Sequence, residues 1–426
     1  MTRILQIVHQ YPPEHVGGSE LYTHQLAQGL IARGHEAAIF TRRNQVGNGL
    51  TLESHENVPI YAAWAGEMSP SQRYLASLGS RSLVASFQQT LDQFQPQLIH
   101  VQHLMGLPLS LIDVVKERQI PFLISVHDYW WVCSNANLIT NYDGTQCVGP
   151  RAQVNCAHCV VARAGGGKAW AAVPAIWAIQ QWRAKKLRRI VESAQAILAP
   201  SEFVCNWYLE HGMASAPLFT LPLGIEAPSV SLSANSADSS KPVRLLYLGG
   251  IAPIKGVHVI IEAMRNVNMN SASENIASRR VELQIAGDLT THPDYADHLR
   301  ALATANVRFL GKLNREQVWQ ALAQADALLV PSLSHETYCF AAREAQSVGT
   351  PLLVSEKGAL TEIVRDGVNG RLLPAGDVRA WQCAIRECLD SPQMLNNFRS
   401  QAIQTMSVSE HVERMVTMYD EILHAT

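Results

Sequence analysis

Residues 326–356 read DALLVPSLSHETYCFAAREAQSVGTPLLVSE and contain one complete succession of strand, loop, helix and strand patterns. The apolar run DALLVPS indicates a buried strand, LSHETYC the loop after it, and FAAREAQSVG a helix that ends at Gly349. A further apolar run, TPLLVSE, begins at once. This order predicts a β–α–β unit, the building block of a parallel sheet.

The same alternation runs through the chain on both sides of a change in texture at residues 226–242. The other β-rich apolar runs lie at 3–10, 36–41, 97–103, 121–127, 195–201, 243–250, 281–288 and 307–311. The segment 226–242 is rich in Ser, Ala and Pro and lacks periodicity, as is typical of a linker. We therefore predict an α/β protein with two doubly wound, Rossmann-like domains, residues 1–225 and 243–400. Because such sheets bind ligands beyond the carboxyl ends of their strands, we expect the domains to face a central cleft.

The composition narrows the classes of function. The chain has 426 residues, with 34 Lys and Arg against 36 Asp and Glu, so no overall field favours nucleic acid as a partner. The first apolar stretch is too short and too interrupted for a signal peptide, and no run approaches ~18 clean apolar residues. We expect a soluble, cytoplasmic chain whose eight cysteines are thiols or metal ligands.

Two carboxylates, Glu336 and Glu344, flank the start of the helix predicted after residue 339. On one continuous helix they would stand roughly 12 Å apart, which is too far for a shared proton. The free N–H groups of a first helical turn between them would make a site for an anion such as a diphosphate. The acids could then accept hydrogen bonds from sugar hydroxyls on either side of that anion. The plainer alternative is one ordinary helix carboxylate and one ordinary loop carboxylate.

Residues 336–377 resemble the retaining glycosyltransferases of the GT-B fold in family 4, whose hallmark is two glutamates separated by seven residues, a small-residue helix end, Gly-x-Pro and a strand. The sequence LGGIAPIKGVHVIIEAM, at 248–264, is similar to that family's nucleotide-diphosphate loop. Residues 4–41 are similar to its opening strand, glycine loop and helix, and SVHDYWW, at 125–131, to its strand-end His-Asp. The resemblance covers nearly the whole chain. It implies a GT-B fold whose last helix, within 401–426, crosses back to the first domain.

The resemblance implies a donor-binding role for a defined set of residues. Glu344 is expected to hold the ribose hydroxyls of a nucleotide sugar, and Glu336 to contact the donor hexose. Lys255 is expected to neutralise the leaving diphosphate, with a solvated loop lysine as the plainer alternative. Gly17 and Gly18 would let the backbone approach the diphosphate or the acceptor closely. The expected donor contacts after the first acid are Thr337, Tyr338, Cys339 and Phe340.

Polar residues at strand ends complete the expected site. His127 matches the family histidine beside the donor sugar, and with Glu336 and Lys255 it makes up the predicted catalytic set. Asp128 and His103 are expected on the acceptor side. The plainer alternatives are a satisfied core histidine for His127 and a turn-forming residue for Asp128.

Half of the eight cysteines gather in one polar, irregular segment: Cys133, Cys147, Cys156 and Cys159. Four thiolates suit a closed, tetrahedral structural zinc site, and an iron–sulfur cluster would use them equally well. Four unlinked thiols are the alternative. Because the segment follows His127 and Asp128, we expect residues 130–165 to form a lid over the acceptor side and to influence acceptor choice.

Residues 176–194, IWAIQQWRAKKLRRIVESA, combine tryptophans with basic residues in a helical pattern. Such a helix can rest on an anionic membrane surface, which would make the chain peripheral at the inner membrane face. An amphipathic surface helix with a solvated basic face is the interpretation that we favour.

The sequence therefore predicts a retaining hexosyltransferase that uses a nucleotide-sugar donor and a sugar or lipid-linked sugar as acceptor, in polysaccharide or glycolipid assembly. No cofactor is expected for catalysis, and the chemistry is expected to be independent of metal. Gly250 stands where the family usually has arginine, and Thr337 begins a segment that the family usually fills with Gly-Phe-Gly. These departures leave a nucleotide-sugar epimerase and a non-catalytic nucleotide-sugar-binding partner subunit as alternatives.

Overall fold

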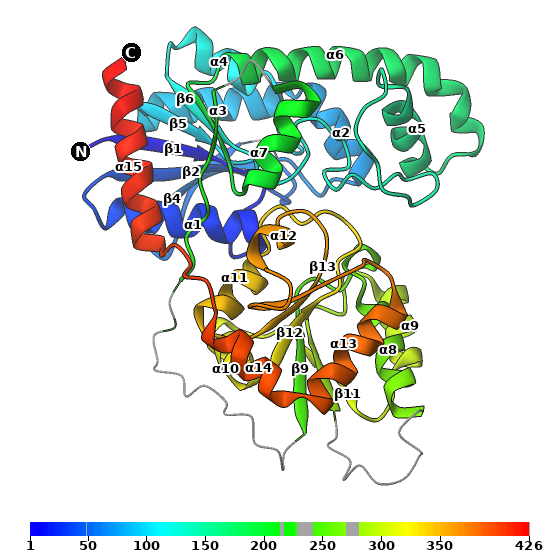
Figure 1. Cartoon of the computed structure of the whole chain (residues 1–426). Coiled ribbons are helices and arrows are strands. Elements are labelled where there is room, and N and C mark those ends of the chain that lie inside the picture. The colour runs from blue at the N-terminus through cyan, green and yellow to red at the C-terminus, as the bar shows by residue number, and fades with distance from the viewer. Residues whose placement is uncertain (48, 214–216, 227, 229–241, 270–280, 426) are drawn as a thin grey trace. The chain divides into compact units, whose positions relative to one another are not determined.

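The computed structural model describes residues 1–47, 49–213, 217–226, 228, 242–269 and 281–425 (Figure 1). The chain divides into two compact units. The first unit comprises Met1–Gly224 and Val408–Thr426, and the second comprises Ile225–Ser407. Most of the linker predicted at 226–242 lies outside the described residues.

The first unit is built on an eight-stranded sheet in the order β3-β4-β2-β1-β5-β6-β7-β8. Its strands are β1 (Arg3–Ile7), β2 (Glu36–Arg43), β3 (Leu50–His55), β4 (Val58–Trp64), β5 (Leu98–Val101), β6 (Phe122–Ser125), β7 (Ala196–Ala199) and β8 (Leu218–Thr220). Neighbouring strands are parallel except β3 and β4, which pair antiparallel. The strand order reverses between β1 and β5, and doubly wound sheets bind their ligands at such a switch point.

Helices of the first unit lie between most of its parallel strands. They are α1 (Gly18–Ile31), α2 (Pro70–Leu78), α3 (Arg81–Phe94), α4 (Leu111–Glu117), α5 (Val154–Arg163), α6 (Val173–Glu192), α7 (Glu202–Tyr208) and α15 (Val408–Ala425). The strands of the sheet centre are almost wholly buried because helices cover them, and their sequences are continuous apolar runs for the same reason. The basic sequence 176–194 forms most of α6.

The C-terminal helix α15 packs on α1 within the first unit, as Figure 1 also shows. A Cβ at Gly29 of α1 would lie 2.5 Å from Val412, so the glycine permits this close approach. Two buried hydrogen bonds fix the helix further: His411 to the Tyr22 hydroxyl at 3.0 Å, and Tyr419 to His100 at 2.7 Å.

The second unit is built on a six-stranded parallel sheet in the order β11-β10-β9-β12-β13-β14. Its strands are β9 (Val243–Leu248), β10 (Val281–Ala286), β11 (Val307–Gly311), β12 (Ala327–Val330), β13 (Leu352–Ser355) and β14 (Gly370–Leu373). Its helices are α8 (Val257–Met269), α9 (Pro293–Leu302), α10 (Arg315–Gln324), α11 (Phe340–Ser347), α12 (Leu360–Ile363), α13 (Val378–Asp390) and α14 (Pro392–Ser400). The order reverses between β9 and β12, which is the switch point of this sheet.

These two sheets confirm the predicted fold class of two Rossmann-like α/β domains. The hairpin of β3 and β4 is an addition that the sequence patterns did not indicate. Its two-residue turn places Glu56 and Asn57 at φ angles of 48° and 66°, the left-handed conformation of a twist-matched hairpin turn, which Asn-Gly would have signalled more clearly. Among the described helices, none is both long and apolar enough to cross a membrane.

Candidate functional site

The loops after β9 and β12 meet at the switch point of the second unit. A short 3₁₀ turn, Pro253–Lys255, follows β9, and the Leu333 N–H in the loop after β12 donates to the Ile254 carbonyl at 2.8 Å. Gly256 ends the turn at φ 69°, where a Cβ would lie 2.0 Å from the Pro331 carbonyl oxygen. Only glycine fits at this position, and the contact brings Lys255 to the loop that carries Glu336.

Lys255 and Glu336 form an ion pair, with Nζ 2.7 Å from Oε1. The Ser332 hydroxyl donates to the same carboxylate oxygen. Burial alone would raise the pKa of Glu336, but Lys255 and Ser332 outweigh burial and lower it. Burial opposes the charge on Lys255, but Glu336 outweighs it and raises the pKa of the lysine. Both side chains are therefore charged at neutral pH.

The backbone around Glu336 is clamped by the turn after β13. The Ala359 N–H donates to the Glu336 carbonyl at 2.8 Å, and a Cβ at Gly358 would lie 2.3 Å from the same oxygen. Gly358 has a φ of 61°, so both its conformation and its close contact require glycine. The first predicted acid thus sits on a loop with a fixed backbone.

Glu344 lies in α11 and pairs with Arg315, the first residue of α10. Their Nη1 and Oε1 atoms are 2.6 Å apart, and the Glu344 side chain is 7% exposed. Arg315 also reaches Glu226 at 3.2 Å and lies over the Trp319 ring at 4.8 Å. Burial raises the pKa of Glu344, and Arg315 offsets this only in part. No local sequence pattern indicated Arg315, because its partner lies 29 residues away on another helix.

The residues between the two acids form the turn into α11. Cys339 has a φ of 61° and immediately precedes the helix, and burial raises the pKa of its thiol to about 12. The Tyr338 ring is buried, 5.2 Å from Phe340 and 5.0 Å from the Arg343 guanidinium. Thr337 begins this turn. The predicted contacts of these residues with a donor stay predictions.

The other predicted set lies in the first unit, at the carboxyl ends of β1, β5 and β6. His127 follows β6, and its Nε2 lies 2.8 Å from the Gln102 side-chain oxygen, so Nε2 is the donor. Gln102 in turn donates to Gln6 at 2.9 Å. Burial, with a smaller contribution from His103, lowers the pKa of His127 to about 3, so the ring is neutral. The sequence analysis missed both glutamines.

His103 and Asp128 are brought together from two neighbouring strand ends. Their Nε2 and Oδ2 atoms are 3.0 Å apart. The Met105 N–H donates to His103 Nδ1 at 3.0 Å, so the ring carries its proton on Nε2 and donates it to Asp128. The other Asp128 oxygen accepts from the Trp130 N–H at 2.8 Å. The pair lies at the switch point, on the strand ends that the sequence indicated.

Gly17 and Gly18 form the beginning of α1. Gly17 precedes the helix in an extended conformation, with φ −129°, and Gly18 is its first residue. Neither residue has the positive φ that demands glycine. A Cβ at Gly17 would instead meet the Glu20 carboxylate at 2.6 Å, so close packing is the local reason for glycine there.

The four clustered cysteines do not form a metal site in the described residues. They line one small cavity of about 20 Å³ together with Ser134 and Asn155. No three of their sulfur atoms lie within 4.8 Å of one another, whereas ~2.3 Å bonds to a tetrahedral zinc would hold sulfurs about 3.8 Å apart. Burial raises the pKa of Cys156 to about 12 and also raises the pKa of Cys133 and Cys159. The predicted zinc or iron–sulfur site is therefore not supported.

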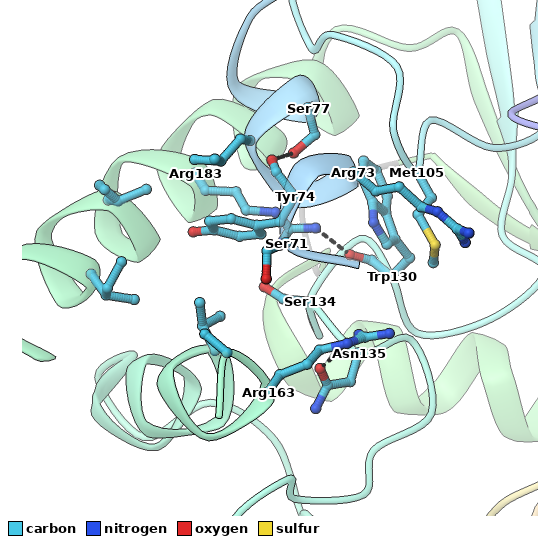
Figure 2. Close-up of a pocket in the computed structure, with 15 residues that line it drawn as sticks. Ser71, Arg73, Tyr74, Ser77, Met105, Trp130, Ser134, Asn135, Arg163 and Arg183 are labelled. Atoms are coloured by element: carbon cyan, nitrogen blue, oxygen red, sulfur yellow. Dashed lines mark hydrogen bonds between the residues drawn. The ribbon is translucent and has the colours of Figure 1, made fainter. Parts of the chain in front are cut away.

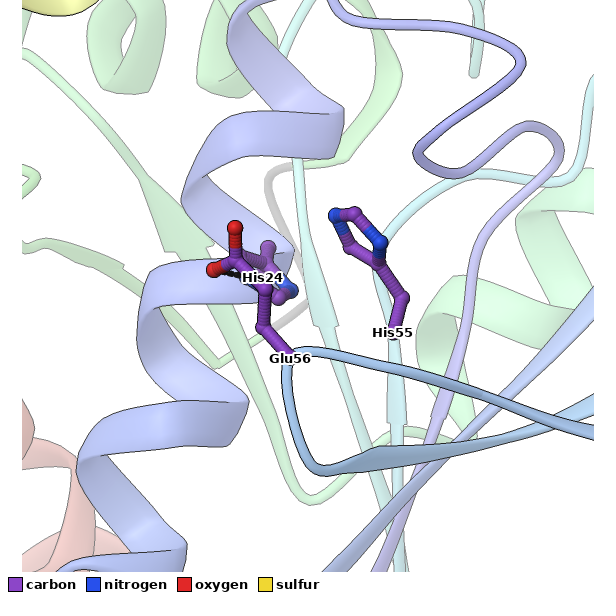
Figure 3. A group of neighbouring side chains, drawn as sticks. All are labelled: His24, His55 and Glu56. Atoms are coloured by element: carbon purple, nitrogen blue, oxygen red, sulfur yellow. Dashed lines mark hydrogen bonds and ion pairs between the residues drawn. The ribbon is translucent and has the colours of Figure 1, made fainter.

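One other group in the described chain has three metal-capable side chains close together: His24, His55 and Glu56 (Figure 3). His24 comes from α1, His55 is the last residue of β3, and Glu56 lies in the β3–β4 turn. Glu56 already accepts from His24 and from Gln28, each at 3.0 Å, and the His24 hydrogen bond lowers the pKa of Glu56. Hydrogen bonds between helix and hairpin account for this cluster.

Two family models match the chain. Residues 16–227 match the model described as Glycosyltransferase Family 4, and residues 232–405 match the one described as Glycosyl transferases group 1. Glycogen synthase of Mycobacterium tuberculosis is 25% identical over 393 residues, covering 92% of this chain and 86% of that protein. The D-inositol 3-phosphate glycosyltransferase of Kineococcus radiotolerans is 25% identical over 400 residues, covering 88% and 83%.

Solved structures show the same fold at lower identity. Sucrose-phosphate synthase from Thermosynechococcus elongatus has a TM-score of 0.74 and 17% identity, covering 100% of each chain. HepE of Anabaena, solved in complex with UDP-glucose, has a TM-score of 0.67 and 17% identity, covering 99% of this chain and 100% of that one. These neighbours confirm the predicted GT-B fold.

Proposed function

Because the chain belongs to the glycosyltransferases of family 4 and group 1, we propose that it transfers a hexose from a nucleotide diphosphate sugar to an acceptor hydroxyl with retention of configuration. The observation that carries this proposal is the Lys255–Glu336 pair at the switch point between β9 and β12. The pair adjoins the start of α11, where helical N–H groups and the helix dipole favour an anion. A diphosphate fits this combination of charges.

The donor is oriented by the two acids. Glu344 accepts hydrogen bonds from the ribose hydroxyls in exchange for its contact with Arg315, and Glu336 accepts from the hexose. HepE, which shares the fold, was solved with UDP-glucose, and this supports a nucleotide sugar as the donor class. A sugar hydroxyl is neutral, so Lys255 keeps its charge for the phosphate.

Lys255 stabilises the transition state. In the transfer, the bond between the anomeric carbon and the β-phosphate oxygen breaks, and its electron pair stays on the phosphate. The acceptor oxygen attacks from the face that the phosphate leaves, and its proton passes to the departing phosphate oxygen. Negative charge grows on that phosphate during the step, so a positioned ammonium group and a helix dipole lower the barrier.

The first unit supplies the acceptor side. Neutral His127, held by Gln102, is the group of the first unit that we propose to hydrogen-bond a sugar hydroxyl. The Asp128 carboxylate, held by His103 and by the Trp130 N–H, accepts a hydrogen bond from the acceptor and orients its hydroxyl. These two side chains are positioning groups in the proposal, because the leaving phosphate receives the proton.

The proposal is tested with the full chain and a panel of UDP-, GDP-, ADP- and dTDP-hexoses. We expect slow release of one nucleoside diphosphate without acceptor, at a rate that does not change with EDTA or Mg²⁺. Thermal unfolding with the free nucleotides should give a raised midpoint for the same base, because a ligand at 100 times its Kd adds ~2.7 kcal/mol to stability. Glu344→Ala should abolish that shift.

Other outcomes separate the competing functions. Interconversion of one hexose into its epimer, with the nucleotide still attached, would replace the transferase by an epimerase. A clear thermal shift without any turnover would indicate a non-catalytic subunit. The glycine at position 250, where a cation was expected, is the reason to consider that alternative. The absence of a shift with every nucleotide would overturn the proposal.

A further inference from the structure

The first unit contains a cavity of about 220 Å³ beside the His103–Asp128 pair (Figure 2). Met105 and Trp130 line it, and both are tied to the pair: the Met105 N–H donates to His103 and the Trp130 N–H donates to Asp128. Small-molecule sites usually measure ~300–1,000 Å³, so this cavity would hold part of a ligand whose remainder extends to the strand ends. The wall is formed by α2, α5 and α6.

Three arginines line the cavity, and no carboxylate is among its lining residues. Arg183 is 2% exposed, its Nη2 donates to the Trp130 carbonyl at 2.9 Å, and its Nε has no partner in the described chain. Among the described residues, the hydrogen-bond acceptors of Arg73 and Arg163 are neutral: the Met68 carbonyl at 3.1 Å and the Asn135 amide oxygen at 3.2 Å. Arg183 is buried, Arg73 is half-buried and Arg163 is exposed, and none of the three pairs with a carboxylate among the described residues. Cations placed in this way indicate a site that an anion completes.

A fourth arginine extends this charge toward the sheet. Arg42 of β2 is 2% exposed, and its Nε and Nη2 atoms have no partner among the described residues. It lies close to Arg73, because a Cβ at Gly106 would be 3.1 Å from Arg42 Nε and 3.5 Å from Arg73 Cγ. Burial and Arg73 lower the pKa of Arg42 to about 10, so it remains charged at neutral pH. Its Nη1 donates to the Asn44 side-chain oxygen at 3.0 Å, but no carboxylate among the described residues forms an ion pair with it. Buried positive charge without an ion-pair partner is costly unless a ligand offsets it.

The rest of the wall combines polar side chains, such as Ser71, Ser134 and Asn135, with an apolar group. The apolar side chains are Leu75, Val160, Ile176 and Ile179, together with Ala164. In Figure 2 the labelled Arg73 and Arg163 lie toward Trp130, and the unlabelled apolar side chains lie at the other end of the cavity. A ligand that fits both ends carries an anion next to a hydrocarbon group.

We propose that this cavity binds the glycosyl acceptor, and that the acceptor is an amphiphile with a phosphate or diphosphate group joined to an apolar chain. The phosphate contacts Arg73 and Arg163, the apolar chain lies against α6, and the hydroxyl to be glycosylated reaches Asp128. The inference rests on the proposed function, because it names the acceptor class of that reaction. It also gives the Cys-rich segment a role, since Val160 and Arg163 of α5 belong to the cavity.

A lipid carrier and a soluble phosphate ester share this chemistry. The apolar end favours the lipid, and α6 also exposes Trp177 and Trp182, at 41% and 48%, as a helix near a lipid surface would. Octyl phosphate below its micellar concentration represents the first source, and glucose 6-phosphate the second. Octyl glucoside supplies the chain without the charge.

The experiment is calorimetric titration of the full chain with these three probes. We expect octyl phosphate to bind at least tenfold more tightly than glucose 6-phosphate and octyl glucoside. Arg73→Gln and Arg163→Gln should each weaken it roughly tenfold to a hundredfold, since each removes a charge-assisted hydrogen bond. Ile179→Ser should weaken octyl phosphate and leave glucose 6-phosphate unchanged. Arg189→Gln changes an exposed arginine of α6 that lies outside the cavity; it is the matched control and should have no effect.

Nucleotide binding, which depends on the second unit, is measured on every variant as a check of folding. Equal affinity for octyl phosphate and glucose 6-phosphate, or equal affinity for octyl phosphate in the wild type and both arginine variants, would overturn the inference. Nucleotide turnover without octyl phosphate binding would overturn the inference about the cavity and leave the transferase proposal intact. Octyl phosphate binding that depends on Arg73, without any nucleotide binding, would instead remove the transferase proposal and keep the site.

Discussion

The charged side chains near the two switch points differ in their partners. At the switch point of the second unit, each candidate acid has a cation in contact: Glu336 has Lys255 and Glu344 has Arg315. Near the switch point of the first unit, Arg42 and Arg183 are buried, and each has at least one nitrogen without a partner among the described residues. In that described part of the chain, Arg73 and Arg163 donate to neutral oxygens. In the second unit, a ligand must replace ion-pair partners that the chain already supplies. In the first unit, a ligand can bind arginines that have no ion-pair partner among the described residues.

This difference has an energetic meaning. Removing one member of a buried ion pair leaves the other charge uncompensated, but removing a buried charge that never had a partner relieves a penalty. Where the pairing outweighs the cost of burial, as it does for Glu336, a paired charge should therefore be essential to stability and to chemistry together. Unpaired charges should reduce the stability of the free protein and contribute only when the ligand is bound.

The largest expected effect is on the paired lysine. Lys255→Met should lower the rate of nucleoside diphosphate release by ~10²–10³-fold, equivalent to ~2.7–4 kcal/mol, because it removes the cation facing the departing phosphate. The measurement is single-turnover release from the donor identified in the nucleotide panel. Lys312→Met, an exposed lysine of the same unit, is the control. An unchanged rate for Lys255→Met would refute the assigned role.

Two adjacent arginines of β2 test the comparison directly. Arg43 and Arg42 are both 2% exposed, but Arg43 pairs with Glu53 at 3.0 Å and donates to the Tyr11 carbonyl at 2.8 Å. Arg43→Met should destabilise the protein by ~3 kcal/mol, because the Glu53 carboxylate and the Tyr11 carbonyl would lose their hydrogen-bond donor. Arg42→Met should instead stabilise the ligand-free protein by ~1–2 kcal/mol.

Denaturant unfolding of the two variants measures both values. Arg42 and Arg43 lie in the same strand and are equally buried, so each variant is the control for the other. Destabilisation by Arg42→Met comparable to that of Arg43→Met would show that Arg42 is satisfied in the free protein, and the contrast between the units would lose its basis.

The two acids of the second unit should respond to pH with opposite signs. Lys255 and Ser332 outweigh burial and hold the pKa of Glu336 below its ordinary 4.5, so its charge stabilises the fold above that pH, and the contribution is lost as pH falls through the lowered pKa. Burial outweighs Arg315 and holds the pKa of Glu344 above 4.5, so ionising it lowers stability as pH rises past 4.5 through the raised pKa.

At pH 7 the thermal midpoint should therefore fall in Glu336→Gln and rise in Glu344→Gln. Both changes should diminish toward pH 4. Glu356→Gln, an exposed acid of the same unit, serves as the reference and should leave the midpoint unchanged. Shifts of the same sign in the two variants would contradict the distinction between the acids.

The sequence could predict the strand ends of both sheets because periodicity and apolar runs are local signals. Such runs directly precede His103, Asp128 and the Lys255 loop. Their positions at strand ends could therefore be predicted from the sequence. Partners such as Gln102 and Arg315 were not, because a side-chain pair between distant elements depends on packing that no local pattern encodes. The metal site predicted at the four cysteines is not supported for a related reason: their spacing in the chain suits zinc, but that spacing does not determine the distances between the sulfur atoms.

The smallest expected effect concerns Gly250, in the loop that leads to Lys255. A Cβ there would meet no atom within 4 Å, and its backbone is held by the Tyr247 hydroxyl, which donates to the Gly250 carbonyl at 2.7 Å. An added side chain therefore has room, and Gly250→Arg should tighten nucleoside diphosphate binding by ~0.2–1 kcal/mol, the range of a solvent-exposed ion pair. Gly250→Gln, which adds length without charge, should not. Tighter binding that disappears in high salt would make the second unit more like the first, with a cation that only a ligand neutralises. Weaker binding in Gly250→Arg would mean that the open space at this position does not face the diphosphate.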